Sequence, residues 1–206
     1  MSDLLVLDAH PRAGSFGAAL ADAYAEGAAA AGVSVSRLTL RDLTFDPILH
    51  DGYAVPQALE PDLVRAQAMI AAARHVTWVY PSWWGAAPAL LKGFIDRAFL
   101  PGWAFKFQSA GKWDKLLAGR SARTIVTMDW PVWAWSLVLG APGRKAMKGA
   151  TLEFCGFKPV RVTELGPVRD STAEQRAAWL DRVKKEAATD AAKLPKPVKQ
   201  LAAAAG

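Results

Sequence analysis

The sequence contains one cysteine, Cys155, in 206 residues. A single cysteine cannot form a disulfide within the chain, and in the stretch LEFCGF it is predicted to be a small buried residue rather than a nucleophile. The three histidines, His10, His50 and His75, are scattered and show no metal-ligand spacing. These shortages argue against a disulfide-stapled domain and against a zinc site.

Long apolar runs and an apolar leader are also missing. The first residues, MSDLLVLDAHPR, lack a basic stretch followed by an apolar run, and no window approaches the roughly 18 apolar residues of a membrane-spanning helix. We therefore expect a cytoplasmic protein without membrane insertion. The net charge of +6 lies largely in the late segment RVKKEAATDAAKLPKPVKQ, which is typical of a solvated helix end and tail, so we expect no nucleic-acid partner.

The chain alternates short apolar runs with longer amphipathic segments, within a composition that fits one domain. The pattern predicts strands over 4–9, 33–40, 75–80, 123–128 and 159–165. Helices are predicted over 15–32, 61–74, 88–99 and 143–156, and from a capping box of Ser171 and Glu174 to about Lys185. This order predicts an α/β fold, most simply a flavodoxin-like doubly wound five-stranded parallel sheet with helices on both faces. The domain is expected to span 1–190, and 191–206 to form a C-terminal tail.

Ligands of such folds bind beyond the carboxyl ends of the strands, so the loops that follow the strands are informative. The first loop, from His10 to Gly17, leads into a helix N-terminus, where N–H groups attract anions. Arg12, Gly14 and Ser15 add charge, flexibility and a hydroxyl that suit a phosphate. The loop is neither a P-loop nor a dinucleotide fingerprint, and Ser15 is equally well explained as a simple helix cap.

Tryptophans stand after two further strands. Trp83 and Trp84 follow the strand that ends at Tyr80 and Pro81, and adjacent residues point in different directions, so at least one ring is expected to line a pocket or an interface rather than the core. The loop TMDWPVWAWS carries three more tryptophans: Trp130, Trp133 and Trp135. An anion cradle between two aromatic walls fits a planar, phosphorylated cofactor.

Three motifs together resemble a known family. HP…GSF, YPSWWGAAPALLKGFIDRAF and GWAFKF are similar to motifs of the flavodoxin-like NAD(P)H:quinone oxidoreductases, the group of DT-diaphorase, bacterial modulator-of-drug-activity proteins and the ancillary reductases of potassium-efflux systems. The resemblance runs from about residue 3 to about residue 185. Its central pattern is specific to the family, because this spacing is not expected by chance: P-x-x-W-x-x-x-P-A-x-L-K-G-F/W-x-D/E-R.

The resemblance implies a flavin cofactor, FAD with FMN as the alternative, and assigns residues to it. The flavin phosphate would fall on His10, Ser15 and Phe16. The ribityl chain and the ring edge would fall on Pro81, Ser82, Trp83 and Trp84. The polar edge of the ring would fall on Thr127, Met128, Asp129 and Trp130. Trp83 is expected to face the flavin, and Trp84, which matches the family's tryptophan, to serve both the pocket and a dimer contact.

The implied activity is two-electron, ping-pong hydride transfer from NADH or NADPH through flavin to a quinone, or to a related nitro or azo compound. The family commonly forms a homodimer through the 88–99 helix and the aromatic loops, with the active sites at the interface. Two alternatives remain: a flavodoxin-type electron carrier and a flavin-containing regulatory subunit. The basic charge and the tryptophan-rich loops weigh against the carrier, whereas nothing in the sequence weighs against the regulatory subunit.

The sequence departs from the family pattern at three points. Gly17 stands where asparagine is common in the phosphate loop. Trp135 replaces the tyrosine of a proposed charge relay and no histidine follows it, so the relay is expected to be missing and no catalytic side chain is assigned. Asp129 would be an unfavourable neighbour for a reduced, anionic flavin ring unless its carboxylate points away.

Overall fold

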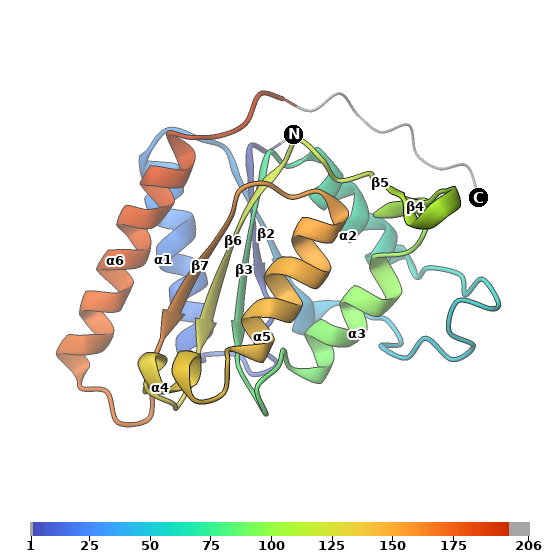
Figure 1. Cartoon of the computed structure of the whole chain (residues 1–206). Helices are drawn as coiled ribbons and strands as arrows, with labels where there is room; N and C mark the ends of the chain where they lie inside the picture. The colour runs from blue at the N-terminus through green and yellow to red at the C-terminus, as the bar shows by residue number, and fades with distance from the viewer. Residues whose placement is uncertain (1, 198–206) are drawn as a thin grey trace.

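The computed structural model describes residues 2–197 and confirms the flavodoxin-like sheet. Five parallel strands lie in the order β2-β1-β3-β6-β7, so the strand order reverses between β1 and β3 (Figure 1). They are β1 (Leu4–Asp8), β2 (Val35–Thr39), β3 (His75–Pro81), β6 (Ser121–Thr127) and β7 (Val160–Leu165). The three central strands are buried along their whole length, as expected of a parallel sheet covered on both faces.

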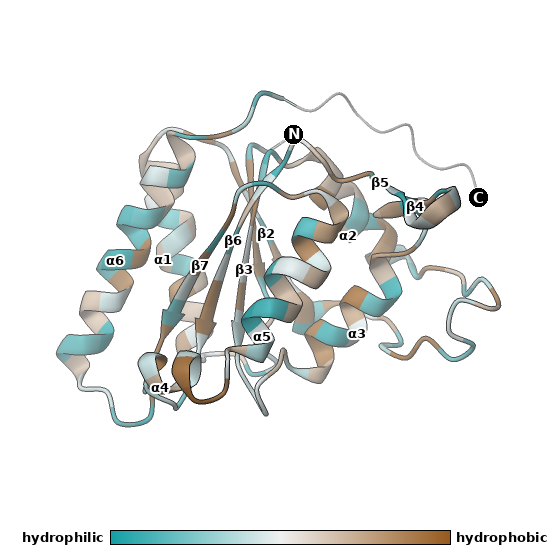
Figure 2. Cartoon of the chain, viewed as in Figure 1, coloured by the Kyte–Doolittle hydropathy of each residue, from teal (hydrophilic) through white to brown (hydrophobic). Residues whose placement is uncertain are grey.

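Helices cover the two faces of the sheet unequally (Figure 1). One face carries α1 (Phe16–Ala30) and α6 (Ala173–Ala191). The other carries α2 (Pro61–Ala72), α3 (Ala89–Ala98) and α5 (Pro142–Arg144), which continues as the π-helix Lys145–Glu153. Successive β1 side chains alternate between the two cores: Leu4 and Val6 pack toward α1 and α6, and Leu5 and Leu7 toward α2 and α3. Hydrophilic residues form patches along the outer helices α5 and α6 (Figure 2). Within residues 2–197, every helix is either too short or too polar to span a bilayer.

A hairpin and a short helix were among the features not predicted from the sequence. A hairpin pairs β4 (Phe105–Phe107) with β5 (Trp113–Lys115), so the GWAFKF motif leads into an antiparallel turn rather than a loop. A short helix, α4 (Val132–Leu137), follows Pro131 in the tryptophan-rich loop after β6. Both are too short to produce a recognisable hydrophobic period.

The start of α6 corrects the predicted cap by one residue. Thr172, not Ser171, caps the helix: its Oγ accepts from Gln175 N (3.2 Å), and Gln175 Oε1 accepts from Thr172 N (2.9 Å). Ser171 instead donates its hydroxyl proton to Val168 O (2.6 Å). The helix also runs past the predicted end near Lys185 to Ala191. Residues 198–206 of the predicted 191–206 tail lie outside the described residues.

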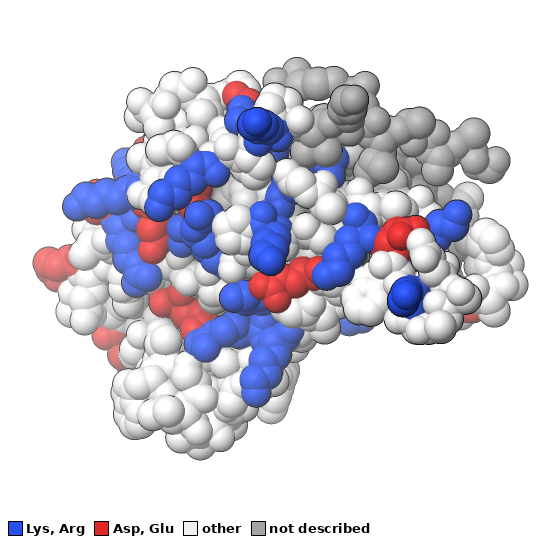
Figure 3. Space-filling view, turned by 45° about the horizontal axis from the view of Figure 1, so that its top comes forward, with Lys and Arg blue, Asp and Glu red and all other residues white. Residues whose placement is uncertain are grey.

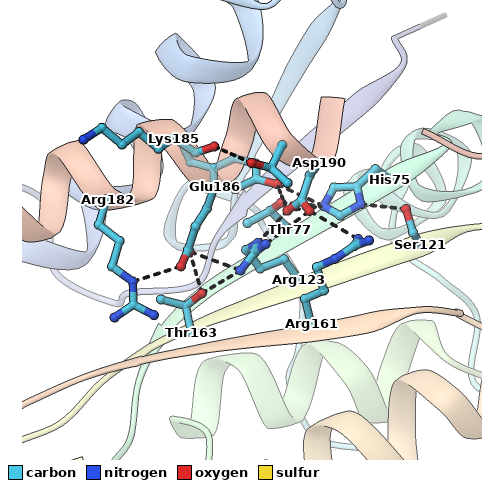
Figure 4. A network of polar contacts seen from close by, with 12 residues as sticks. His75, Thr77, Ser121, Arg123, Arg161, Thr163, Arg182, Lys185, Glu186 and Asp190 are labelled. Carbon is cyan, nitrogen blue, oxygen red and sulfur yellow. Dashed lines mark hydrogen bonds and ion pairs between the residues drawn. The ribbon is translucent and has the colours of Figure 1, made fainter. Parts of the chain in front are cut away.

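A buried polar network holds the end of α6 to the amino edge of the sheet (Figure 4). Asp190 receives hydrogen bonds from Arg123 Nε (2.5 Å) and from Tyr24 Oη (2.7 Å). His75 contacts the hydroxyls of Ser121 through Nδ1 (2.8 Å) and of Tyr24 through Nε2 (3.1 Å). Because Asp190 is buried and bonded from two other elements, the helix cannot end before it without leaving those groups unpaired.

The LKGFIDR motif fixes the long irregular segment 41–60 against α3. Gly93 packs so closely on Pro47 that a Cβ there would lie 2.4 Å from Pro47 Cβ. One turn later, the fully buried Arg97 donates to Asp46 O (2.5 Å) and to Glu60 Oε2 (2.9 Å). Both motif residues therefore act on the fold rather than on a ligand.

Candidate functional site

The three predicted ligand loops leave the sheet side by side at its carboxyl edge. Hydrogen bonds extend beyond the strands and join their ends: Ala9 N donates to Val79 O (2.9 Å), Ser82 N to Thr127 O (2.7 Å), and Met128 N to Leu165 O (3.0 Å). The loops after β1, β3 and β6 therefore start from fixed, adjacent positions at the point where the strand order reverses.

The loop after β1 has the donors and the space to receive a phosphate. Ser15 caps α1, its Oγ accepting from Ala18 N (3.1 Å), which leaves the hydroxyl proton free to donate to an anion. The first N–H groups of α1, beginning at Phe16, point out of the helix end. Gly14 has a φ of +62° and nothing within 4 Å of the position of a Cβ, so the loop forms an open cradle.

A buried carboxylate that was not recognised from the sequence shapes this loop. Asp8, the last residue of β1, accepts from His10 N through Oδ1 (3.1 Å) and from Arg41 Nη1 through Oδ2 (2.6 Å). Arg41 also donates to His10 O (3.3 Å). The guanidinium and the carboxylate together hold the His10 backbone from both sides.

A backbone hydrogen bond sets the tautomer of the neutral His10 ring. Its Nδ1 accepts from Arg12 N (3.0 Å), which places the proton of the neutral ring on Nε2. Burial lowers the pKa of His10, against the nearby Asp8 carboxylate, which raises it. The ring meets Trp83 edge to face at 5.9 Å, so the loops after β1 and β3 touch through these two side chains.

The two adjacent tryptophans stand on a tight turn. Trp83 N donates to Ala86 O (3.0 Å) and Ala86 N to Trp83 O (2.9 Å), and the two residues between them, Trp84 and Gly85, have φ values of +51° and +74°. Positive φ at both central residues is the signature of a type I′ turn, which favours Asn-Gly and penalises a residue such as tryptophan.

Neither ring belongs to the core. Trp84 is entirely exposed and Trp83 is half exposed, which confirms that at least one ring points away from the interior. A tryptophan that gains no burial and occupies a strained backbone position does not contribute to folding stability, so its presence calls for a ligand or a partner.

The first residues of the loop after β6 are fixed by burial and by backbone hydrogen bonds. Thr127 and Met128 are buried, and both backbone groups of Met128 are used inside the protein, with Val168 N donating to Met128 O (2.9 Å). Trp130 is half exposed. Asp129 turns toward the β7–α6 loop, where its Oδ1 accepts from Arg169 N (2.9 Å) and its Oδ2 lies 3.3 Å from Arg169 Nη2. Its carboxylate is therefore compensated by a cation.

Trp135, at the position of the family's relay tyrosine, is a packing residue. Its ring is buried against Gly85, and its Nε1 donates to Glu164 Oε1 (3.2 Å). Glu164 also pairs with Arg144, whose Nη2 donates to Ser136 Oγ (2.7 Å). This group anchors α4 to β7 and to the tryptophan turn, and it leaves no side chain at this position to relay a charge.

The donor set at this edge fits a flavin. An open helix N-terminus with a free hydroxyl proton suits the phosphate, and exposed aromatic rings of Trp83, Trp84 and Trp130 suit the planar ring. Among residues 2–197, no cluster of three or more histidine, cysteine or carboxylate side chains forms a metal site.

Comparison with known proteins agrees with this geometry. A model of a family described as having the flavodoxin-like fold matches residues 2–187. A protein of Haemophilus influenzae named an uncharacterized NAD(P)H oxidoreductase is 33% identical over 128 residues, which is 60% of this chain and 63% of that protein. The ribosyldihydronicotinamide dehydrogenase (quinone) of Rattus norvegicus is 31% identical over 146 residues, 62% of this chain and 58% of that protein.

Among solved structures, an NAD(P)H:quinone oxidoreductase from Methanothermobacter marburgensis has a TM-score of 0.76 at 22% identity, covering 91% of this chain and 98% of that one. The matched segments span less than two thirds of the two curated relatives from Haemophilus and rat. Because the family model matches nearly all of the described chain, the chain belongs to the flavodoxin-like fold family, among relatives that are named NAD(P)H oxidoreductases and quinone dehydrogenases.

Proposed function

We propose that this protein is a cytoplasmic, flavin-dependent NAD(P)H oxidoreductase that reduces quinones, or related nitro and azo compounds, by two-electron transfer. The observation that carries the proposal is the Trp84–Gly85 turn, which holds an entirely exposed tryptophan in a left-handed conformation at the carboxyl edge of the sheet. The names of the Haemophilus and rat relatives support the same reaction class.

The loops divide the binding of the cofactor between them. The phosphate would be held by the N–H groups at Ser15 and Phe16, by the Ser15 hydroxyl and by the Nε2–H of His10. Pro81, Ser82, Trp83 and Trp84 would line the ribityl chain and one edge of the ring. Thr127, Met128, Asp129 and Trp130 would line the polar edge of the ring on the other side, where Thr127 and Met128 are buried.

Bound flavin supplies the redox chemistry, accepting hydride from NADH or NADPH and passing it to the acceptor that enters the same slot next. The protein contributes binding and orientation. Because Trp135 is buried and its Nε1 is occupied by Glu164, stabilisation of negative charge on the ring would come from backbone N–H groups after β6. The pairing of Asp129 with Arg169 removes the repulsion that a free carboxylate would add.

FAD is the proposed cofactor and FMN the alternative. Both carry the same ring and first phosphate, so the three loops described above do not separate them. Heat release of the flavin from purified protein, followed by chromatography against FAD and FMN standards, distinguishes the two.

A homodimer is part of the proposal. On the α3 side of the molecule the β4–β5 hairpin leaves Phe107 and Trp113 exposed, and Trp113 stacks on Phe154 at 4.8 Å, so exposed aromatic side chains are available to a second copy. Size-exclusion chromatography with light scattering tests this, and Phe107→Asp is expected to shift the mass to that of one chain.

Steady-state turnover tests the function itself. Rapid oxidation of NADH or NADPH that depends on a small soluble quinone supports a reductase. Bound flavin with negligible turnover would instead favour an electron carrier or a regulatory subunit. Colourless protein whose flavin absorbance neither FMN nor FAD restores would refute all three.

A further inference from the structure

The tryptophan turn packs on three residues of the segment after β6. A Cβ on Gly143 would lie 2.7 Å from Gly85 O and 3.5 Å from Ala86 Cα, so only glycine fits there without a shift of one backbone. A Cβ on Gly85 would lie 3.5 Å from Pro142 Cγ and 3.6 Å from Cη2 of the Trp135 ring. The platform formed by Trp135, Pro142 and Gly143 is therefore in close contact with the turn.

The platform is fixed by one carboxylate of the edge strand β7. Glu164 is almost fully buried, and it accepts hydrogen bonds from Trp135 Nε1 (3.2 Å) and from Arg144 Nε (2.9 Å). Arg144 Nη2 also donates to Ser136 Oγ (2.7 Å). Because Arg144 directly follows Gly143, Glu164 holds both ends of the platform against the sheet.

The segment that carries the platform has no charge of its own. Residues 130–143 contain no titratable side chain, and the lower end of the molecule in Figure 3, where α4 lies, is uncharged. Within this segment Ala141 is buried with a φ of +48°, a left-handed conformation that persists only where the surroundings enforce it. The ionic anchor comes from outside the segment, from Glu164 and Arg144.

We propose that Gly143 and Glu164 are positioning residues of the flavin site, which act through the turn that carries Trp84. Gly143 supports the turn by direct packing, and Glu164 fixes the platform. A left-handed turn with tryptophan at its centre is strained, so without this support it is expected to relax and to move the exposed ring. The effect on flavin binding rests on the proposed function, whereas the support of the turn does not.

This role differs from that of a charge relay. Trp135 stands where the resemblance implies a relay tyrosine, but an indole is a donor only, and its Nε1–H is used by Glu164. Trp135 therefore acts on the site by packing against Gly85, and not by moving charge.

Hydrogen exchange in the flavin-free protein tests the support of the turn. The amide of Ala86 donates to Trp83 O (2.9 Å) across the turn, so its exchange rate, measured by NMR, reports how often the turn opens. Gly143→Ala places a methyl group against Gly85 O, and Glu164→Gln removes the charge that holds Arg144. Each substitution is expected to raise the exchange rate of Ala86 by about tenfold.

Flavin titration tests the action through Trp84. Gly143→Ala is expected to weaken flavin binding by about threefold to tenfold, because a loss transmitted through Trp84 cannot exceed the loss expected when that ring is removed. Glu164→Gln is expected to act in the same direction. In a Trp84→Asn background, both substitutions are expected to change the flavin affinity by less than about twofold. Residues that act independently of Trp84 would instead give additive losses.

Two matched controls accompany these variants. In Gly149→Ala nothing lies within 4 Å of the added Cβ, and Glu153→Gln removes the charge of a half-exposed carboxylate on the π-helix. Both controls are expected to match the wild type in Ala86 exchange and in flavin affinity.

Either of two results would overturn the proposal. One is an exchange rate of Ala86 that neither Gly143→Ala nor Glu164→Gln changes. The other is a loss of flavin affinity that is equally large with tryptophan and with asparagine at position 84. A wild-type protein that binds neither FAD nor FMN, while Ala86 exchange responds as expected, would instead refute the proposed function alone.

Discussion

The guanidinium of Arg41 lies 2.6 Å from the carboxylate of Asp8, and the two residues hold the His10 backbone between them. Asp8 is at the end of β1 and fully buried, whereas Arg41 comes from the segment after β2. The pair thus ties the start of the candidate phosphate loop to a neighbouring strand and fixes it before any ligand arrives.

Arg41→Ala is expected to destabilise the protein by about 3 kcal/mol, because it leaves the buried Asp8 carboxylate without its cation. Flavin affinity is expected to fall as well, since the loop loses its support. Urea unfolding of the apoprotein and fluorescence titration with flavin measure the two effects. Adding Asp8→Asn to Arg41→Ala is expected to recover part of the stability. Arg12→Ala, an exposed change in the same loop, serves as the control for stability, and an equal loss of stability in that variant would contradict the role of the Arg41–Asp8 pair.

Trp84→Asn is expected to separate binding from folding. Asparagine tolerates the positive φ of this turn, so the stability of the apoprotein is expected to stay the same or to rise by up to about 1 kcal/mol. The affinity for flavin is expected to fall by about tenfold, because one aromatic wall of the site is lost. Trp84→Ala should weaken flavin retention in the same direction.

Thermal unfolding without flavin and flavin titration give the two measurements, and Tyr53→Ala is the control on an exposed aromatic side chain far along the chain from the three loops. If Trp84→Asn strongly lowers the stability of the apoprotein and leaves the flavin affinity unchanged, Trp84 stabilises the fold and does not bind flavin.

The strands and the position of the site could be predicted because their causes are local. A strand buried on both faces is a short, nearly continuous apolar run, and β1, β3 and β6 are such runs. The carboxyl ends of parallel strands then meet at one edge without further information. The prediction that at least one tryptophan of the pair would lie outside the core rested on the different directions of adjacent side chains, which is also a local property, and it is confirmed.

What was missed depends on contacts between distant parts of the chain. Asp8 and Arg41 are far apart in sequence, and neither type nor spacing marks them as partners before β1 and β2 are aligned. The cap of α6 was misplaced because Ser171 and Thr172 both start a capping-box pattern, and only the engagement of Ser171 with Val168 O decides between them. The strands of the hairpin and helix α4 are too short to show a recognisable hydrophobic periodicity in the sequence.

Gly93→Ala is expected to destabilise the protein by about 1–3 kcal/mol. The added Cβ would lie 2.4 Å from Pro47 Cβ and 2.7 Å from Pro47 O, so α3 or the backbone of the long segment must move. Gly149→Ala is the matched control, since nothing lies within 4 Å of a Cβ there. That change is expected to be neutral or mildly stabilising. Chemical denaturation measures the free energy of unfolding of both variants. Equal losses of stability would contradict the close approach of Gly93 and Pro47.

His75 is expected to make the fold sensitive to mild acid. Burial lowers the pKa of His75 to about 4 from an ordinary value of 6.5, so between these values the unfolded chain binds a proton that the folded chain does not. Stability is therefore complete above the unfolded pKa and is lost as the pH falls from about 6.5 to about 4, by up to roughly 3 kcal/mol. Below that range, protonation of Asp190, whose pKa is lowered by Arg123 against the effect of burial, removes more.

Urea unfolding at pH 7, 6 and 5 tests the acid sensitivity in the wild type and in His75→Gln, which keeps a polar side chain in the network but cannot titrate. The variant is expected to lose stability at pH 7, because hydrogen bonds to Ser121 and Tyr24 are disturbed, yet to show a flatter decline toward pH 5. His50→Gln, on an exposed side chain, should leave the decline as steep as in the wild type. Should His75→Gln decline as steeply, the acid sensitivity must arise elsewhere, and His10, whose pKa is also lowered by burial, would be the next residue to replace.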